Sequence, residues 1–137
     1  MDKFVQYLAA AGAGIVTYML GGWDVLIKVV IVVIALDVAS GILASKKEGH
    51  TIKSSIMQAG LWKRVGYLVA LILAVWLDIL LVDQGVLDAG GLVRNTALFG
   101  ILLPEVKSVD ENLGRLGVPL TGMFSKFLDK LKTPGNP

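Results

Sequence analysis

The chain has 137 residues, of which 55% are hydrophobic and 18% charged, with a formal net charge of +2. Its mean hydropathy of +0.71 leaves too few polar side chains to cover a soluble domain of this length, so we expect an all-α integral membrane protein, with the lipid bilayer as partner. The charge is too small to indicate nucleic-acid binding, and the absence of cysteine excludes disulfides, thiolate metal ligands and cysteine nucleophiles.

Residues 4–20 form the first apolar segment and are predicted to span the membrane, although their length is marginal. Ala9 and Ala13 place small side chains four residues apart, which suits close packing against another helix. Gly21 and Gly22 then interrupt the helix. The segment partly resembles a secretory signal peptide, but an acidic second residue weakens the basic start, and we expect the segment to remain in the mature chain.

The central apolar run, residues 25–44, is the clearest predicted membrane span. As a helix it reaches ~30 Å, which matches the hydrocarbon thickness of a bilayer. From Val29 to Leu36 the sequence is apolar on every side, whereas a soluble core helix would keep one polar face.

Asp37 lies deep in this run, where an ionisable group costs roughly 2.5–3.5 kcal/mol. Ser40, Gly41 and Ala44 share its helix face, at spacings of three, four and seven residues, and their small size allows another helix to approach. We therefore expect this face to pack against a helix or to line water. The alternative is a protonated carboxyl group that rests against a neighbour and has no function.

Residues 45–64 are rich in lysine and arginine and are predicted to form a cytoplasmic loop, because basic residues in short connections stay on the cytoplasmic side. Ile52 to Met57 suit either a short amphipathic helix on the membrane surface or a solvated connector. The single histidine, His50, has no partner nearby for catalysis or metal binding, which is typical of a surface residue.

A further span is predicted over residues 65–82, with Asp78 in its outer third. Helical rise puts Lys28 of the antiparallel central span at a similar height, so we expect Lys28 and Asp78 to compensate each other's charge. Asp24, four residues before Lys28, is a competing partner. Asp37 and Asp78 differ by ~9 Å in depth, which is long for direct proton exchange.

Residues 92–103 form a fourth, shorter apolar segment, closed by Pro104. Basic residues follow it, and they belong in the cytoplasm only if this segment crosses the membrane. The prediction is therefore a bundle of four transmembrane helices over residues 1–104, with the C-terminus in the cytoplasm. In the alternative, the fourth segment lies along the interface and the tail is outside.

The tail, residues 105–137, is predicted to be cytoplasmic and helical, with a mobile end. Ser108 and Glu111 suit a capping box at the start of a helix that Gly117 and Pro119 end. A C-terminal amphipathic helix should follow and rest on lipid or on a second subunit.

Nothing in the sequence predicts catalysis. It contains no phosphate-binding glycine loop, no metal-ligand spacing and no nucleophile with a base partner. We therefore expect a protein that is not an enzyme and has no catalytic residue, cofactor or metal.

Two stretches resemble the toxin-secretion and phage-lysis holins. The first runs from DVASGILA at residues 37–44, through the basic loop, to the span that ends near Asp78. The second, SVDENLGRLGVP at residues 108–119, is the more specific, although Thr121 stands where many members have proline. The signature residues of the second stretch are Ser108, Glu111, Asn112, Gly117 and Pro119.

The resemblance implies a multi-pass protein of the bacterial cytoplasmic membrane. Such a protein forms homo-oligomeric lesions through which an endolysin, or a toxin in related systems, leaves the cell. The lesion does not have to bind the protein that it releases. A small ion or proton channel or transporter subunit is the rival hypothesis, and an antiholin-type membrane partner is the third. The candidate pore-lining or packing residues are Asp37, Ser40, Gly41, Ala44, Asp78 and Lys28.

Overall fold

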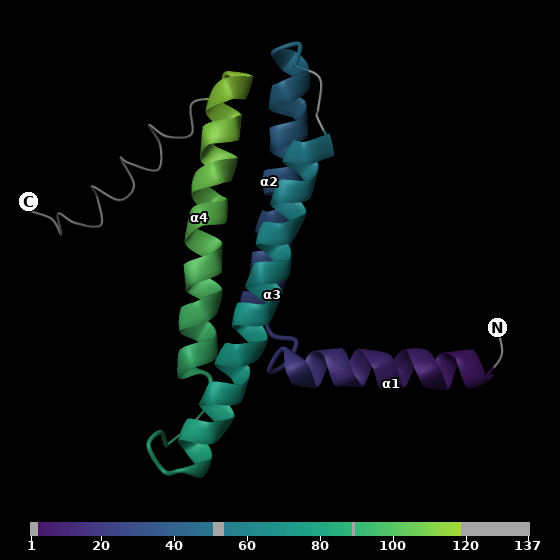
Figure 1. Cartoon of the computed structure of the whole chain (residues 1–137), viewed down its shortest axis with the longest axis vertical. Helices are drawn as coiled ribbons and strands as arrows, with labels where there is room; N and C mark the ends of the chain where they lie inside the picture. The colour runs from purple at the N-terminus through teal and green to yellow at the C-terminus, as the bar shows by residue number, and fades with distance from the viewer. Residues whose placement is uncertain (1–2, 51–53, 89, 119–137) are drawn as a thin grey trace, which may run out of the picture.

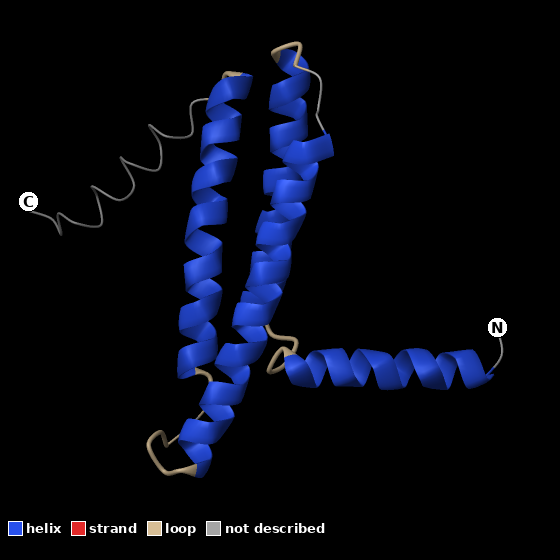
Figure 2. Cartoon of the chain, viewed as in Figure 1, coloured by secondary structure: helices blue, strands red, loops and turns tan. Residues whose placement is uncertain are grey.

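The computed structural model describes residues 3–50, 54–88 and 90–118. Within these ranges the chain forms four helices and no strand, which confirms the predicted all-α class (Figure 2). The helices are α1 (Lys3–Met19), α2 (Val25–Lys47), α3 (Ser54–Asp83) and α4 (Leu92–Leu116).

Three of these helices lie side by side, and the fourth points away from them. In Figure 1, α2, α3 and α4 form an elongated bundle, and α1 projects sideways from it. No residue of α1 is buried, so the close packing predicted for Ala9 and Ala13 does not form within the described part of the chain. The break after α1 forms where it was predicted, because Gly21 and Gly22 adopt positive φ angles of 70° and 112°.

Two helices of the described part are long and apolar enough to cross a membrane, namely Val25–Lys47 and Gly60–Asp83. They contain the two spans predicted most clearly from the sequence. Asp24 caps the start of α2, because its Oδ1 accepts a hydrogen bond from the Ile27 amide at 3.1 Å. That bond satisfies one of the amides that a helix leaves free in its first turn.

The loop predicted over residues 45–64 is wrong in its extent. α2 continues to Lys47 and α3 begins at Ser54, so the connection is much shorter. Because the helix that begins at Ser54 continues into the α3 span, the prediction of a separate surface helix is wrong. Residues 51–53 lie outside the described ranges.

The fourth helix is longer than predicted. Pro104 lies inside α4 instead of closing it, and the expected boundary after this residue falls within one continuous helix. Proline removes one helical hydrogen bond, but most of a helix's stability comes from packing its buried face, and α4 packs along its whole length.

The predicted start of a tail helix is also wrong. Ser108 and Glu111 lie in the middle of α4 and therefore do not form a capping box at a helix start. Gly117 ends the helix as predicted, with a φ of 87° that glycine adopts readily. Pro119 and the predicted C-terminal amphipathic helix lie outside the described ranges.

The core lies between α2, α3 and α4. Leu98 is fully buried, and around it pack Leu20, Ile27, Val30, Leu71 and Ile101. The buried face of α4 has helical spacing and carries apolar and polar side chains together: Arg94, Leu98, Ile101, Glu105 and Asn112. The polar members of this face organise the two clusters described next.

Candidate functional site: two polar clusters between the helices

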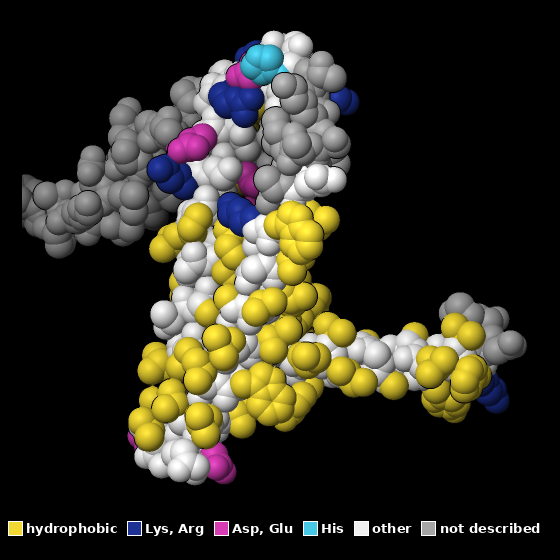
Figure 3. Space-filling view, in the orientation of Figure 1, with side chains coloured by type: hydrophobic (Ala, Val, Ile, Leu, Met, Phe, Trp, Pro, Cys, Tyr) yellow, Lys and Arg dark blue, Asp and Glu magenta, His cyan; other side chains and the backbone are white. Residues whose placement is uncertain are grey.

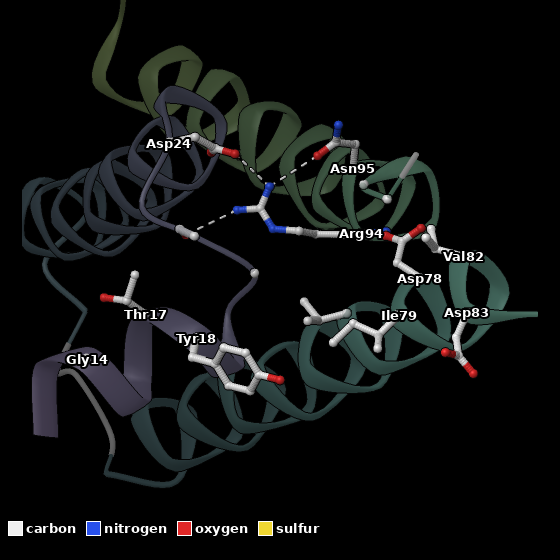
Figure 4. A pocket seen from close by; sticks show the side chains of 15 residues that line it. Gly14, Thr17, Tyr18, Asp24, Asp78, Ile79, Val82, Asp83, Arg94 and Asn95 are labelled. Atoms are coloured by element: carbon white, nitrogen blue, oxygen red, sulfur yellow. Dashed lines mark hydrogen bonds and ion pairs between the residues drawn. The ribbon is translucent and has the colours of Figure 1, made fainter. Parts of the chain in front are cut away.

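The first polar cluster, the Arg94 cluster, joins the start of α4 to the turn between α1 and α2. The buried Arg94 guanidinium donates from Nη1 to Asp24 Oδ2 (2.7 Å) and from Nη2 to the Gly22 carbonyl (3.3 Å) (Figure 4). Its Nε donates to the Leu20 carbonyl (2.7 Å). A Cβ atom at Gly21 would lie 2.7 Å from Arg94 Cδ, so only glycine fits there. Arg94 also holds the pKa of Asp24 below its usual value, mainly through their hydrogen bond.

Asp78 reaches the same place from α3. Its Oδ1 accepts a hydrogen bond from the Val93 amide (3.0 Å), and its Oδ2 accepts one from the Arg94 amide (2.7 Å). These amides belong to the first turn of α4, where Gly91 has no side chain to cap them. The positive end of the α4 dipole therefore stabilises the buried Asp78 carboxylate.

The predicted pair between Lys28 and Asp78 is wrong. Lys28 is exposed, whereas the Asp78 carboxylate faces the start of α4. Asp24, the competing partner considered for Lys28, instead binds Arg94. Arg94 was not predicted from the sequence as a site residue. The signal that could have identified it is its position as a lone arginine at the edge of an apolar segment.

An open cavity of about 1100 Å³ adjoins the Arg94 cluster between α1, α3 and α4. Figure 4 shows Thr17 and Tyr18 of α1 across from Ile79 and Asp83 of α3, with Arg94 reaching past them. The carboxylates of Asp24 and Asp78 on its wall already accept hydrogen bonds. In the described ranges, no group of three acidic or histidine side chains is placed to hold a metal ion.

The second polar cluster, the Arg64 cluster, joins the three bundle helices toward their other end. Asp37 of α2 accepts a hydrogen bond at Oδ2 from Arg64 Nη2 of α3 (3.1 Å). The Asn112 amide of α4 donates to the Asp37 carbonyl (3.3 Å), to Asp37 Oδ1 (3.3 Å) and to Ser40 Oγ (3.2 Å). Asp37 therefore contacts both partner helices of its own chain.

Glu105 of α4 completes the Arg64 cluster. Its side chain is fully buried, and it forms an ion pair with Lys63 and accepts a hydrogen bond from the Tyr67 hydroxyl (2.8 Å). Arg64 Nη2 lies 3.9 Å from Glu105 Oε2. Arg64 is thus shared between two acidic side chains, one from α2 and one from α4.

The small side chains that follow Asp37 lie against α4. Ser40 and Ala44 are buried, and a Cβ at Gly41 would lie 3.4 Å from Asn112 Nδ2. The space that their size leaves is occupied by α4 of the same chain. Their role in pore lining or in assembly stays a prediction.

The α2 and α4 ends beyond the Arg64 cluster are joined as well. Lys47 Nζ donates to the carbonyls of Arg115 (3.2 Å) and Leu116 (2.8 Å), which closes the C-terminus of α4. Arg115 Nε donates to Glu48 Oε1 (2.9 Å), and this arginine holds the pKa of Glu48 below its usual value. His50 lies on the surface beside Glu48, as predicted.

A model of the bacteriophage holin family matches residues 14–133. An uncharacterized protein of Halalkalibacterium halodurans is 25% identical over 96% of both chains. An uncharacterized 14.9 kDa protein of Clostridium perfringens is 31% identical, over 96% of this chain and 97% of its own length. An uncharacterized protein of Listeria monocytogenes is 27% identical, over 93% and 86% respectively. No solved structure shows significant similarity to this chain.

Replacing Arg64 by methionine tests the Arg64 cluster. Arg64→Met keeps an apolar stem but leaves Asp37 and Glu105 without a shared cation, so we expect a loss of roughly 2–4 kcal/mol in the free energy of unfolding. Unfolding is followed by circular dichroism in detergent micelles. Lys107→Met is the control, because the Lys107 side chain is 78% exposed and, within the described residues, pairs only with Glu111 on its own helix.

A double variant isolates the contact itself. Asp37→Asn should cost less in the Arg64→Met background than in the native chain, because the charge pair is then already lost. Equal stability of Arg64→Met and Lys107→Met would contradict the cluster's role.

Proposed function

Since this chain belongs to the bacteriophage holin family, we propose that it assembles into homo-oligomeric lesions in the bacterial cytoplasmic membrane and so releases an endolysin, or a toxin, from the cell. The observation that carries the proposal is the family match, which covers residues 14–133 and includes both helices that are apolar enough to span a membrane. Release through a lesion requires no substrate turnover and no specific contact with the released enzyme.

In the proposed topology, the connection between α2 and α3 and the C-terminus lie in the cytoplasm. Figure 3 supports this orientation: lysine and arginine side chains gather at the end of the bundle near that connection, and apolar side chains cover much of the rest of the visible face. α2, α3 and α4 would then each cross the membrane. A fourth crossing, by α1, requires this helix to turn about Gly21 and Gly22 until it runs along the bundle.

The two polar clusters support a stable resting state for a single subunit. Asp37, Asp78 and Glu105 all have partners within the chain, so one copy can sit in a bilayer without a neighbour to compensate these charges. Assembly then shifts the population from packed single subunits to oligomers, and anything that weakens the packed state favours the shift.

The rival function, a proton or ion channel that uses Asp37, has less support. Arg64 and Asn112 both contact the Asp37 carboxylate within the chain, so this carboxylate is already engaged and is not free to coordinate a passing ion. The antiholin hypothesis differs from the proposed function only in the expected effect on the cell. The co-expression experiment described next separates all three functions.

Co-expression with a cytoplasmic cell-wall-degrading enzyme tests the proposed function. We expect an abrupt fall in culture turbidity and the appearance of the enzyme in the medium. Depolarisation without enzyme release would identify an ion channel and contradict the proposal. Neither effect would fit an antiholin-type partner. Expression of each protein alone is the control.

Asp37→Ala tests the link between the packed state and assembly. Removing this carboxylate breaks the contacts with Arg64 and Asn112, so we expect lysis to begin earlier than with the native chain at equal protein level. Leu36→Ala is the matched control, because the neighbouring Leu36 side chain is 51% exposed and holds no helix in place. Unchanged timing with normal accumulation of Asp37→Ala would contradict this coupling.

A further inference from the structure

Helix α1 carries bulky apolar side chains on one side and small or polar side chains on the other. The members of the bulky side recur at helical spacing and are all exposed: Val5, Leu8, Ile15, Val16 and Met19. The opposite side consists of Gln6, Ala10, Ala13, Gly14 and Thr17. We call the first set the apolar face of α1 and the second its small face. A helix divided in this way can rest at a boundary between an apolar and a polar medium.

The C-terminal end of α1 is fixed to the bundle. Arg94 of α4 donates hydrogen bonds to the carbonyls of Leu20 (2.7 Å) and Gly22 (3.3 Å), and the Leu20 side chain is buried in the core. The Tyr18 ring packs edge-on against Trp76 of α3, with 6.3 Å between the ring centroids. These contacts hold the turn after α1 in the conformation that makes this helix project sideways (Figure 1).

The turn after α1 also sets the depth of this helix. α2 starts at Val25, directly after the turn, and ends at Lys47, which puts the turn ~34 Å from the basic end of the bundle. This distance is slightly more than the thickness of a bilayer's hydrocarbon. With the connection between α2 and α3 in the cytoplasm, α1 therefore leaves the bundle at the outer membrane boundary. Because α1 projects sideways, all of its 17 residues stay near this level.

The cavity beside the Arg94 cluster indicates which face of α1 points outward. Gly14 and Thr17 of the small face line this cavity opposite Asp83 and Gly90, which belong to the end of α3 and its connection to α4 (Figure 4). In the proposed topology this connection lies outside the membrane, so the small face points outward. The apolar face then points back toward the level of the exposed apolar side chains of α3, such as Leu73.

We propose that α1 does not cross the membrane but lies along its outer boundary, with the apolar face among the acyl chains of the outer leaflet and the small face toward the outer surface. Lipid removes from water the bulky side chains that the bundle leaves exposed. The chain then crosses the membrane three times, by α2, α3 and α4, and its N-terminus lies outside. This inference rests on the proposed membrane topology and is independent of lesion formation.

Single cysteines test the inference, because the natural sequence contains none. Leu8→Cys and Ile15→Cys mark the apolar face at two points, and the native side chains there are 58% and 60% exposed. Ala10→Cys is the matched variant on the small face, since Ala10 is also exposed. Cells express each variant without the cell-wall-degrading enzyme. Their protoplasts, taken before lesions form, are treated intact or broken with a charged, membrane-impermeant maleimide.

In intact protoplasts we expect Ala10→Cys to be labelled roughly tenfold or more faster than Leu8→Cys and Ile15→Cys, because a thiol becomes a reactive thiolate in water and not in lipid. The two apolar-face cysteines should react at similar slow rates, since a helix that lies flat keeps both at one depth. A crossing helix would separate them by ~10 Å in depth.

Three results would overturn the inference. Protection of Ala10→Cys in intact protoplasts would indicate that α1 crosses the membrane, and equally fast labelling of all three cysteines would place α1 in water. Disulfide-linked dimers through Leu8→Cys or Ile15→Cys after mild oxidation would show that a second copy covers the apolar face. The absence of enzyme release from cells that co-express the native chain and the enzyme would instead overturn the proposed function and leave the position of α1 unaffected.

Discussion

The structure depends on the attachment of α4 to α2 at both ends. Arg94 binds the Leu20 and Gly22 carbonyls and Asp24, and at the opposite end Lys47 binds the last carbonyls of α4. A bilayer offers no hydrogen bonds to the protein, so polar groups that enter it must be satisfied by protein or by enclosed water. These bonds hold α4, a moderately polar helix, beside the apolar helix α2.

This attachment divides the polar groups of the bundle into two sets. The inward set, with Asp37, Asp78 and Glu105, has hydrogen-bond or ion-pair partners within one chain. The outward set lies on the exposed side of α4, where Lys107 and Glu111 form an ion pair with each other.

The apolar helices could be predicted from the sequence, whereas the continuation of α4 through Pro104 could not. The runs that became α2 and α3 are long and uniformly apolar, so length alone identifies them. Pro104 was misleading because proline usually ends a helix, whereas here helix on both sides of it packs against the same neighbours. Gly117 was informative because a left-handed glycine is the usual helix end.

The polar contacts were less predictable, since they depend on which way side chains face. Helical rise gives a height for Asp78 but no direction, and the partners of Asp78 are backbone amides of α4 instead of Lys28. Asp37 and the small residues Ser40 and Ala44 could be recognised as one helix face from spacing. Their contacts, Arg64 and Asn112, come from positions far along the chain that only the fold brings together.

The central claim is that α4 crosses the membrane alongside α2, and single cysteines at its two ends test it most directly. Val86→Cys lies in the connection before α4, and Val118→Cys follows its end; both side chains are exposed. Intact protoplasts, taken before lysis begins, are treated with an impermeant maleimide and compared with broken protoplasts. Labelling of Val86→Cys in intact protoplasts, with Val118→Cys labelled only after breakage, is the predicted result. Labelling of both cysteines from the same side would contradict a crossing by α4.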